Sequence, residues 1–396
     1  MPNNQHNIPH HPTLFNLGFR PFFMGASIFA PISIAIWLGI FVGVIPFSSS
    51  EITPLQWHAH EMIFGYSFAV IAGFLLTAVK NWTGLQTPHG YPLAGIFLSW
   101  VTARILWLFG GTFISVAAFF DMLFVISLIV AISMPIVQKR QWRQLAILSK
   151  LILLGVGNAV FYLDVFGMVH QTIHMVLYSG VYLVIGLILT MGRRVIPMFI
   201  EGGVSEDVTL FNSTILDRSS LLFFLVFFIS AVFVDMPLLA KGAAAALFII
   251  TTARIIGWYT PGIWRSPLLW CFAVSLLSID LGFLLYALEG PLSISPYLSI
   301  HAFAVGGIGV ITMGMMARVS IGHTGRKISA PPRLLWLSLF LLGITLVLRV
   351  ICPLIFQSSH DYWIELSSIF WITSYLLFCC HFVPIWFSPR VDNKYG

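Results

Sequence analysis

Charged residues are scarce in this chain. Only 9% of its 396 residues are Asp, Glu, Lys or Arg, whereas 58% are apolar. Soluble domains carry roughly 25% charged residues, because their surface has to be hydrated. The shortage therefore excludes a soluble enzyme, an intrinsically disordered chain and a soluble nucleic-acid-binding protein. The surface around the apolar residues is expected to be lipid, so the lipid bilayer is the first partner that the composition predicts.

Cysteine is also rare, and so are carboxylates. The four cysteines lie inside apolar runs, and no two of them have the C-x-x-C spacing; they are Cys271, Cys352, Cys379 and Cys380. This pattern is typical of small core residues and argues against a disulfide framework or a zinc site. Asp and Glu together number 14, which disfavours sites for hard cations, since these bind mainly to oxygen ligands.

What the chain has instead is a series of long apolar runs. Runs of about 20 residues are long enough to cross a bilayer as helices, and glycine, proline and polar clusters separate them. They predict an all-α membrane protein of twelve transmembrane helices, over 21–45, 58–79, 91–109, 111–137, 145–166, 170–191, 218–236, 237–259, 267–288, 295–317, 334–352 and 362–386. One bundle accounts for the whole chain, so we expect a single membrane domain over 1–396.

The basic residues indicate how these helices are oriented. If the N-terminus is cytoplasmic, nearly all of the 20 Lys and Arg residues fall on the cytoplasmic side, and only Lys241 falls in an outer loop. Arg104 and Arg349 lie within predicted helices. Because cytoplasmic loops carry an excess of Lys and Arg, the distribution predicts that both termini are cytoplasmic. The excess of basic over acidic residues is then explained by membrane topology and by contact with anionic lipids of the inner leaflet, and it does not indicate a nucleic-acid partner.

A histidine recurs near the start of every fourth predicted helix. When His60, His174 and His301 are aligned, a glycine follows each of them at nearly the same distance; these are Gly73, Gly186 and Gly314. The recurrence suggests three four-helix units, at approximately 20–137, 145–259 and 267–387.

The predicted topology places five histidines at one depth near the outer face: His58, His60, His170, His174 and His301. His170 and His174 are four residues apart and are expected on one face of a helix. A single histidine at a membrane interface is usually an ordinary hydrogen-bonded side chain. Five at one depth predict a metal or haem site, because imidazole binds iron, copper and zinc. Glu61 could orient a ligand or relay protons.

Charged residues inside the spans form a second candidate group. Arg104 and Asp121 lie at similar depths on neighbouring predicted helices, as do Arg349 and Glu365. Charges within a membrane usually face the protein interior in pairs, so two structural ion pairs are one interpretation. The other is that Arg104 or Arg349 binds an anionic group such as a haem propionate, since the guanidinium group matches a carboxylate.

Four sequence blocks, at 18–23 (GFRPFF), 57–84 (WHAHEMIFG and onward), 192–199 (GRRVIPMF) and 301–326 (ending RVSIGHTGR), resemble the NnrS family. The blocks follow the family's order and extend over essentially the whole chain. The resemblance implies a bacterial inner-membrane protein of twelve helices that contains haem and copper. The family is associated with the response to nitric oxide and nitrosative stress, often beside denitrification functions. Nitric oxide or a related nitrogen oxide is thus an expected ligand, and no established catalysed reaction comes with the resemblance.

The expected architecture is also similar to the main subunit of haem-copper oxidases and nitric oxide reductases. Those proteins are twelve-helix bundles of three four-helix arcs, with histidine ligands near the outer ends of helices 2, 6 and 10. The similarity favours His60, His174 and His301 as ligands of haem or copper, followed by His58 and His170. Arg104 and Arg349 would then hold propionates.

Two other functions are compatible with the sequence. A twelve-helix secondary transporter for a metal or a small anion is the main rival, although transporter sites usually lie near the bilayer midplane. The third is a non-catalytic metal-handling or sensing partner of denitrification enzymes. Whether the chain is an enzyme is left open by the sequence.

Overall fold

A computed structural model describes residues 11–47, 49, 51–234, 236–290, 292, 294–392 and 394–396. Within these residues the fold is entirely helical and contains no strand. The all-α prediction is therefore confirmed. The N-terminal residues 1–10, which the sequence places on the cytoplasmic side, lie outside the described residues.

The α-helices are α1 (Phe19–Phe41), α2 (Pro54–His60), α3 (Phe68–Thr83), α4 (Tyr91–Trp107), α5 (Ile114–Gln138), α6 (Leu145–Val165), α7 (Ile173–Glu201), α8 (Thr214–Val232), α9 (Pro237–Trp258), α10 (Pro267–Leu288), α11 (Pro296–His301), α12 (Ile311–His323), α13 (Arg333–Leu346), α14 (Cys352–Ile355) and α15 (His360–Phe387). Three π-helical segments join consecutive helices: η2 (Glu61–Ser67), η6 (Ala302–Val310) and η7 (Val347–Ile351). Short 3-10 turns complete the structure: η1 (Thr13–Phe15), η3 (Gly110–Phe113), η4 (Trp142–Gln144), η5 (Pro261–Arg265) and η8 (Gln357–Ser359).

Eleven helical stretches of the described chain are long and apolar enough to cross a membrane. This number indicates a multi-pass membrane protein. The stretch predicted over 91–109 forms as α4, which is 17 residues long and is not among the eleven. At 1.5 Å per residue it would extend about 25 Å, close to the lower limit for a transmembrane helix. The twelfth crossing therefore stays a prediction that depends on α4.

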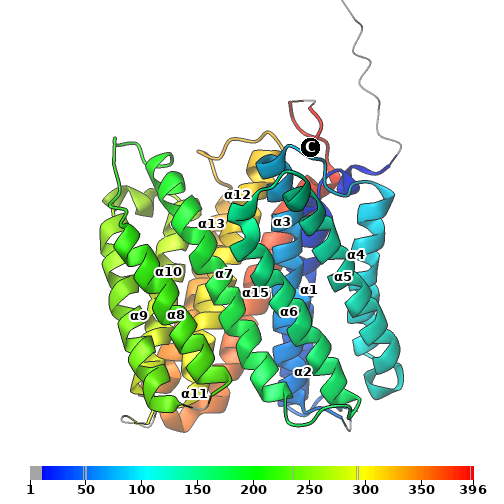
Figure 1. Cartoon of the computed structure of the whole chain (residues 1–396), viewed down its shortest axis with the longest axis vertical. Helices are drawn as coiled ribbons and strands as arrows, with labels where there is room; N and C mark the ends of the chain where they lie inside the picture. Colours follow the sequence, from blue (N-terminus) through cyan, green and yellow to red (C-terminus); the bar gives the residue numbers. More distant parts are fainter. Residues whose placement is uncertain are drawn as a thin grey trace, which may run out of the picture.

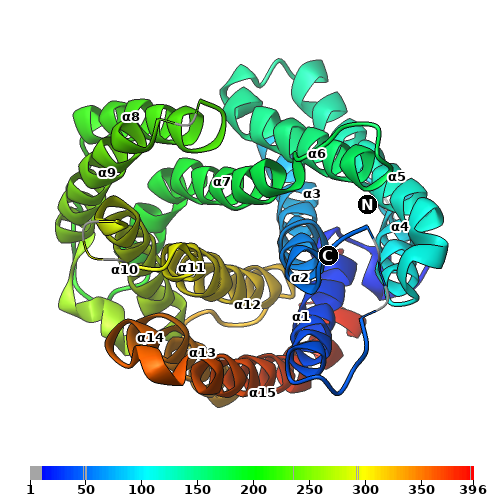
Figure 2. The same ribbon diagram turned by 90° about the horizontal axis from the view of Figure 1, so that it is seen from below.

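Three helical stretches form the centre of the bundle (Figure 2). They are α2–η2–α3, α7 and α11–η6–α12. In the most apolar 18-residue segment of each stretch, 83%, 78% and 72% of the residues are buried, respectively. The corresponding fraction is 22–44% for every other candidate span except α10, at 67%. These central stretches are the three that contain the aligned histidines His60, His174 and His301 and the glycines that follow them.

Local sequence explains where the first of these stretches begins and ends. Thr53 caps α2 in a reciprocal capping box with Gln56, and Pro54 occupies the first turn, where its missing N–H costs nothing. At the other end, Gly84 has a φ of +69°, a left-handed conformation that favours glycine after a helix. The cap sets the start of α2 four residues earlier than the predicted start at residue 58.

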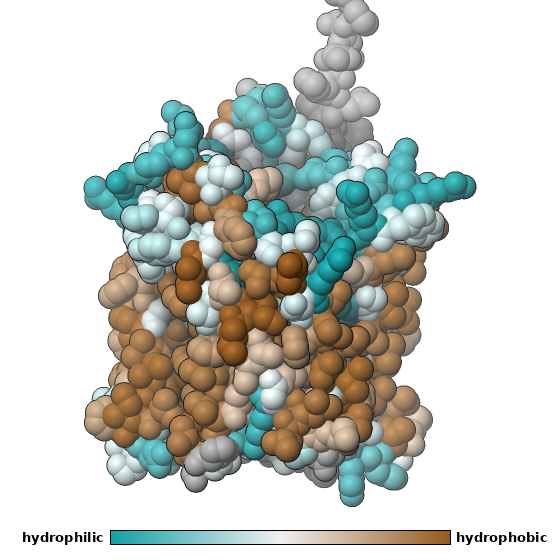
Figure 3. Space-filling view, turned by 60° about the vertical axis from the view of Figure 1, so that its left-hand side comes forward, coloured by the Kyte–Doolittle hydropathy of each residue, from teal (hydrophilic) through white to brown (hydrophobic). Residues whose placement is uncertain are grey.

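The surface follows the arrangement expected of a membrane protein. In the space-filling view a broad apolar band separates two more hydrophilic ends, and the larger hydrophilic region is at the upper end (Figure 3). The C-terminus lies at that upper end, whereas α2 and α11 lie at the lower end (Figure 1). The candidate histidines on α2 and α11 are thus far from the C-terminus.

Candidate functional site

Two adjoining cavities lie at the end of the bundle that carries α2 and α11. The first, which we term the Arg349 cavity, has a volume of about 560 Å³ and is lined by His58, His301 and Arg349. The second, the His174 cavity, has a volume of about 840 Å³ and is lined by His58, His174 and His301. His58 and His301 line both cavities, so the structure brings three of the five predicted histidines together.

His58 lines both cavities and has a ring nitrogen without a hydrogen-bond partner. Its imidazole stacks on the indole of Trp37 in α1, with 4.6 Å between ring centroids and 21° between ring planes. Its Nδ1 atom is buried and has no hydrogen-bond partner. A buried polar atom without a partner is costly, so an absent ligand is one explanation for this nitrogen.

His301 is oriented by its own helix. Its Nδ1 lies 2.6 Å from the carbonyl oxygen of Tyr297, one turn earlier. A carbonyl oxygen only accepts, so Nδ1 carries the proton and Nε2 keeps its lone pair. Bonding of one ring nitrogen to a backbone carbonyl is the usual way in which proteins orient a metal-binding imidazole. His174 is more exposed, at the first turn of α7, and its ring packs 4.2 Å from that of Tyr178.

Arg349 has no anionic partner among the described residues. Its Nη1 atom is buried without a hydrogen bond, and no ion pair joins it to Glu365 or to any other described carboxylate. The predicted Arg349–Glu365 pair is therefore wrong. An unpartnered guanidinium within an apolar bundle favours an anionic ligand, which leaves the second interpretation of Arg349 in place.

The π-helical segments surround this region. η2 begins directly after His60, η6 begins directly after His301, and η7 contains Arg349. π-Helical turns inside α-helices are rare and occur frequently at functional sites. Three of them at one end of one bundle support a functional role for that end, on grounds independent of the histidines.

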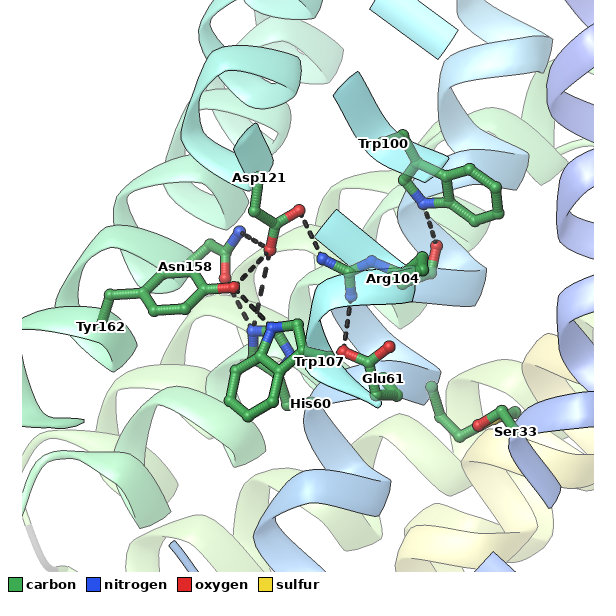
Figure 4. A network of polar contacts seen from close by, with 11 residues as sticks. Ser33, His60, Glu61, Trp100, Arg104, Trp107, Asp121, Asn158 and Tyr162 are labelled. Atoms are coloured by element: carbon green, nitrogen blue, oxygen red, sulfur yellow. Dashed lines mark hydrogen bonds and ion pairs between the residues drawn. The ribbon is translucent and has the colours of Figure 1, made fainter. Parts of the chain in front are cut away.

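His60 lies away from the cavities, in a buried polar network on the α5 and α6 side of α2 (Figure 4). Its Nδ1 is 3.0 Å from Oε1 of Glu61, and its Nε2 is 3.0 Å from Oδ1 of Asn158. The amide nitrogen of Asn158 donates to Asp121, at 3.1 Å, so the amide oxygen faces the imidazole. Both ring nitrogens are thus hydrogen-bonded, and neither is free to bind a metal in this arrangement.

Arg104 joins two carboxylates in the same network. Its Nη1 is 2.6 Å from Oε1 of Glu61, and its Nη2 is 2.6 Å from Oδ1 of Asp121. The Arg104 and Asp121 pair that the sequence predicts is therefore present, with Glu61 as an additional partner. Gly65 permits this approach, because a Cβ there would lie 3.1 Å from Nη1 of Arg104 and 2.8 Å from the ring of Phe29.

The network combines one guanidinium group with two carboxyl side chains. Arg104 lies between Glu61 and Asp121, and His60 hydrogen-bonds to Glu61. All four side chains are at most 4% exposed. Buried charges are tolerated only when they are paired and hydrogen-bonded. Both terminal nitrogens of Arg104 are paired with carboxylates, but Nε and Nη2 of Arg104 and Oδ1 of Asp121 have no hydrogen-bond partner. A propionate at Arg104 therefore stays a prediction.

His170 is outside the helix in which it was predicted. α7 begins at Ile173, and His170 is an exposed loop residue followed by Gln171 with a φ of +60°. The prediction that His170 and His174 share one helical face is therefore wrong. The reversal of the chain at Gln171 is the physical reason, since it breaks the helical register between the two histidines.

Comparison with known proteins identifies the family of this chain. The sequence matches the NnrS protein family over residues 13–390. The chain belongs to the NnrS family. No curated protein matches the sequence. The match covers nearly the full chain, so the resemblance carried by the four sequence blocks is confirmed.

Several polar residues of the buried network in this NnrS-family chain were not predicted from the sequence. Asn158 and Tyr162 in α6 both hydrogen-bond to Asp121, and Trp107 donates to the Tyr162 hydroxyl at 2.8 Å. Asn158 stood out in the sequence as an amide within an apolar run, which was the available signal. The stacking partner Trp37 gave no such signal among thirteen tryptophans.

The donor set also limits which metal centre is preformed. In the described part of the chain, no group of three or more His, Cys, Asp and Glu side chains is arranged to hold a metal ion. The cavities therefore present separate imidazoles, not a ready-made metal cage. A haem needs only one or two axial side chains, and the arrangement fits that requirement.

Proposed function

We propose that this membrane protein binds haem in the Arg349 cavity and acts in the response to nitric oxide. The observation that supports the proposal is the combination of two imidazoles and an unpartnered guanidinium in one cavity. His58 has a buried ring nitrogen without a partner, His301 keeps a free Nε2, and Arg349 lacks an anion. These are the groups that an iron porphyrin with carboxylate side chains requires.

Each residue has a distinct part in this proposal. His58 or His301 would supply a nitrogen ligand to the iron, with Trp37 and the Tyr297 carbonyl orienting the two imidazole rings. Arg349 binds a propionate. Apolar side chains such as Ile34 and Val305 complete the wall and exclude water. Haem iron supplies the capacity to bind nitric oxide and to exchange an electron.

Copper, the second metal that the family resemblance implies, fits less directly. His174 faces His58 and His301 across the His174 cavity, and imidazole suits copper. However, a copper ion held by all three would require the side chains to approach one another more closely than they do among the described residues. We therefore assign His174 as the first candidate for copper and attribute no chemical step to it.

The charges support one orientation in the membrane. Nearly all Lys and Arg residues fall in the segments that the sequence assigns to the side of the termini. By the positive-inside rule we propose that this side is cytoplasmic and that the two cavities lie near the periplasmic face of the bacterial inner membrane. Nitric oxide is small, neutral and soluble in lipid, so it can reach the cavities from the bilayer. A site near one face is also unlike the midplane site of most secondary transporters.

The test is the haem content of the purified, detergent-solubilised full chain. We expect His58→Ala or His301→Ala to lower the haem-to-protein ratio and to shift the absorbance maximum of the haem that remains. His174→Ala should lower copper content and leave haem bound. His170→Ala is the matched control, because its imidazole lies outside the cavities and near the same face.

Arg349→Leu provides a second, independent readout. Loss of the propionate partner should weaken haem retention during dilution without changing the axial ligands, so the absorbance maximum should stay fixed. The proposal is overturned if the protein contains no haem after expression with adequate haem supply. It is equally overturned if His58→Ala and His301→Ala both retain the full haem content and spectrum.

A further inference from the structure

A third cavity lies near the opposite end of the bundle from the histidines, and it is rich in basic groups. It has a volume of about 490 Å³, between α6, α7, α8 and α9. Lys150, Arg193 and Arg254 line it, and Asp217 is the carboxylate among its described lining residues. The described lining therefore carries a net charge of two positive units, in a protein that has few charges to place.

The single carboxylate does not satisfy all three bases. Asp217 binds Arg254 at 2.9 Å and Arg193 at 3.4 Å. The ammonium group of Lys150 has only a backbone partner, the carbonyl oxygen of Ala146 at 3.0 Å. Arg254 is buried and held by Asp217, whereas Arg193 is 35% exposed. Lys150 and Arg193 are thus the groups with donors to spare for an added anion.

The lower wall of the cavity is apolar. Leu189 of α7 and Leu221 and Phe224 of α8 line it, and Leu221 is among the exposed large apolar residues. Gly186 keeps the cavity open, because a Cβ there would lie 2.7 Å from the Phe224 ring and 3.3 Å from Cε of Lys150. Basic groups therefore lie above an apolar groove. This arrangement matches a phospholipid, whose anionic headgroup lies above its apolar acyl chains.

The position of the cavity in the bundle supports this match. α6 and α8 lie on either side of α7 (Figure 2), so the groove opens between two outer helices, toward lipid. Lys150 is in the second turn of α6, Asp217 in the first turn of α8 and Arg254 in the last turns of α9. Residues near helix ends lie at the level of the headgroups, and basic pockets there bind anionic lipids.

We propose that this cavity binds the phosphate of an anionic phospholipid from the leaflet at the C-terminal end of the bundle. Lys150 and Arg193 bind the phosphate, and the first methylene groups of an acyl chain lie against Leu189, Leu221 and Phe224. Thr190 and Ser220, which also line the cavity, offer hydroxyl groups to the headgroup.

The test is lipid binding by the detergent-solubilised full chain, measured by native mass spectrometry during titration with phosphatidylglycerol or phosphatidylcholine. We expect phosphatidylglycerol to bind more tightly. Lys150→Gln should weaken it about fivefold, and Lys150→Gln with Arg193→Gln about twenty-fivefold, as expected for a basic residue near a membrane surface. The single variant removes no ion pair, so it keeps the test valid if the double variant is unstable.

The matched control is the double variant Lys139→Gln with Arg143→Gln. It removes the same charge from two exposed residues at the same end of the bundle, and it should leave the affinity for phosphatidylglycerol unchanged. Equal affinity for the two lipids, or equal weakening by the control variant, would overturn the proposal. Displacement of the lipid by inorganic phosphate alone would also overturn it, since the site would then be one for free phosphate.

Discussion

The buried charge network around Arg104 should be among the most sensitive points of the fold. Arg104 is held between Glu61 and Asp121 at 2.6 Å from each, and the three side chains are 0–4% exposed. Arg104→Met would leave the two buried carboxyl groups without their guanidinium partner. Removing one partner of a buried ion pair costs about 3–5 kcal/mol, so we expect a loss of unfolding free energy in that range.

A double-mutant cycle separates charge imbalance from lost packing. Asp121→Asn combined with Arg104→Met removes one charge of each sign and leaves Glu61 beside His60. We expect the double variant to be less destabilised than the sum of the two single variants, with a coupling of about 2 kcal/mol, within the usual range for residues in one network. The same cycle with Glu61→Gln should behave similarly.

The assay is unfolding of the purified protein by sodium dodecyl sulfate in mixed micelles, followed by circular dichroism. The control is Arg265→Met, because Arg265 pairs with Glu206 at 2.8 Å on an exposed surface, with the two side chains 71% and 49% exposed. Such pairs contribute about 0–1 kcal/mol. Similar effects of Arg104→Met and Arg265→Met, or simple additivity of Arg104→Met and Asp121→Asn, would contradict a strong charge coupling in the network.

Two further predictions concern packing and pH. Gly306→Ala should lower the unfolding free energy by about 1–3 kcal/mol, because the added Cβ would lie 2.3 Å from Oγ of Ser278. Adding Ser278→Gly should recover part of that loss in the same unfolding assay. A double variant with no recovery would contradict the steric explanation. Burial raises the pKa of Glu289, which accepts a hydrogen bond from Ser299 and lies just after α10, above its ordinary value of 4.5. Folding therefore favours its protonated form, and its contribution to stability is full below pH 4.5 and is lost as pH rises through the raised value. Glu289→Gln should flatten that part of a melting temperature against pH profile, and an unchanged slope would count against the assignment.

The helices were predictable because their physical requirement is simple. An apolar run of about 20 residues has few alternatives to a buried or lipid-facing helix, and the described helices fall where those runs fall. Their ends were less predictable, since they depend on local contacts. α7 starts at Ile173 because the chain reverses at Gln171, and α1 ends at Phe41, four residues before its predicted end.

The membrane depth of the candidate site was predictable, and the two-residue spacing of His58 and His60 predicts that they meet different neighbours, but the sequence did not show which of them joins His174 and His301. Sequence register placed His60 with His174 and His301, because all three occupy equivalent positions along their helices. In the structure, His58 lines a cavity with His174 and His301, whereas His60 hydrogen-bonds within the charge network. Register fixes depth along a helix, whereas rotation about the helix axis decides which neighbour a side chain meets. The π-helical segments η2 and η6 follow His60 and His301 directly, and no residue pattern in the sequence indicated them.

α2 therefore connects the charge network around Arg104 with the two cavities lined by His58. Residues two apart on a helix point about 200° from each other, so His58 faces the cavities while His60 faces Asn158 on α6. Any rotation of α2 that moved His58 would also separate His60 from Asn158 and Glu61 from Arg104. The network thus holds the azimuth of His58 through buried charged contacts, which deform less readily than apolar packing. If His58 binds the haem iron, weakening the network should first change the orientation of its imidazole, and so the absorbance spectrum, before it changes how much haem is bound.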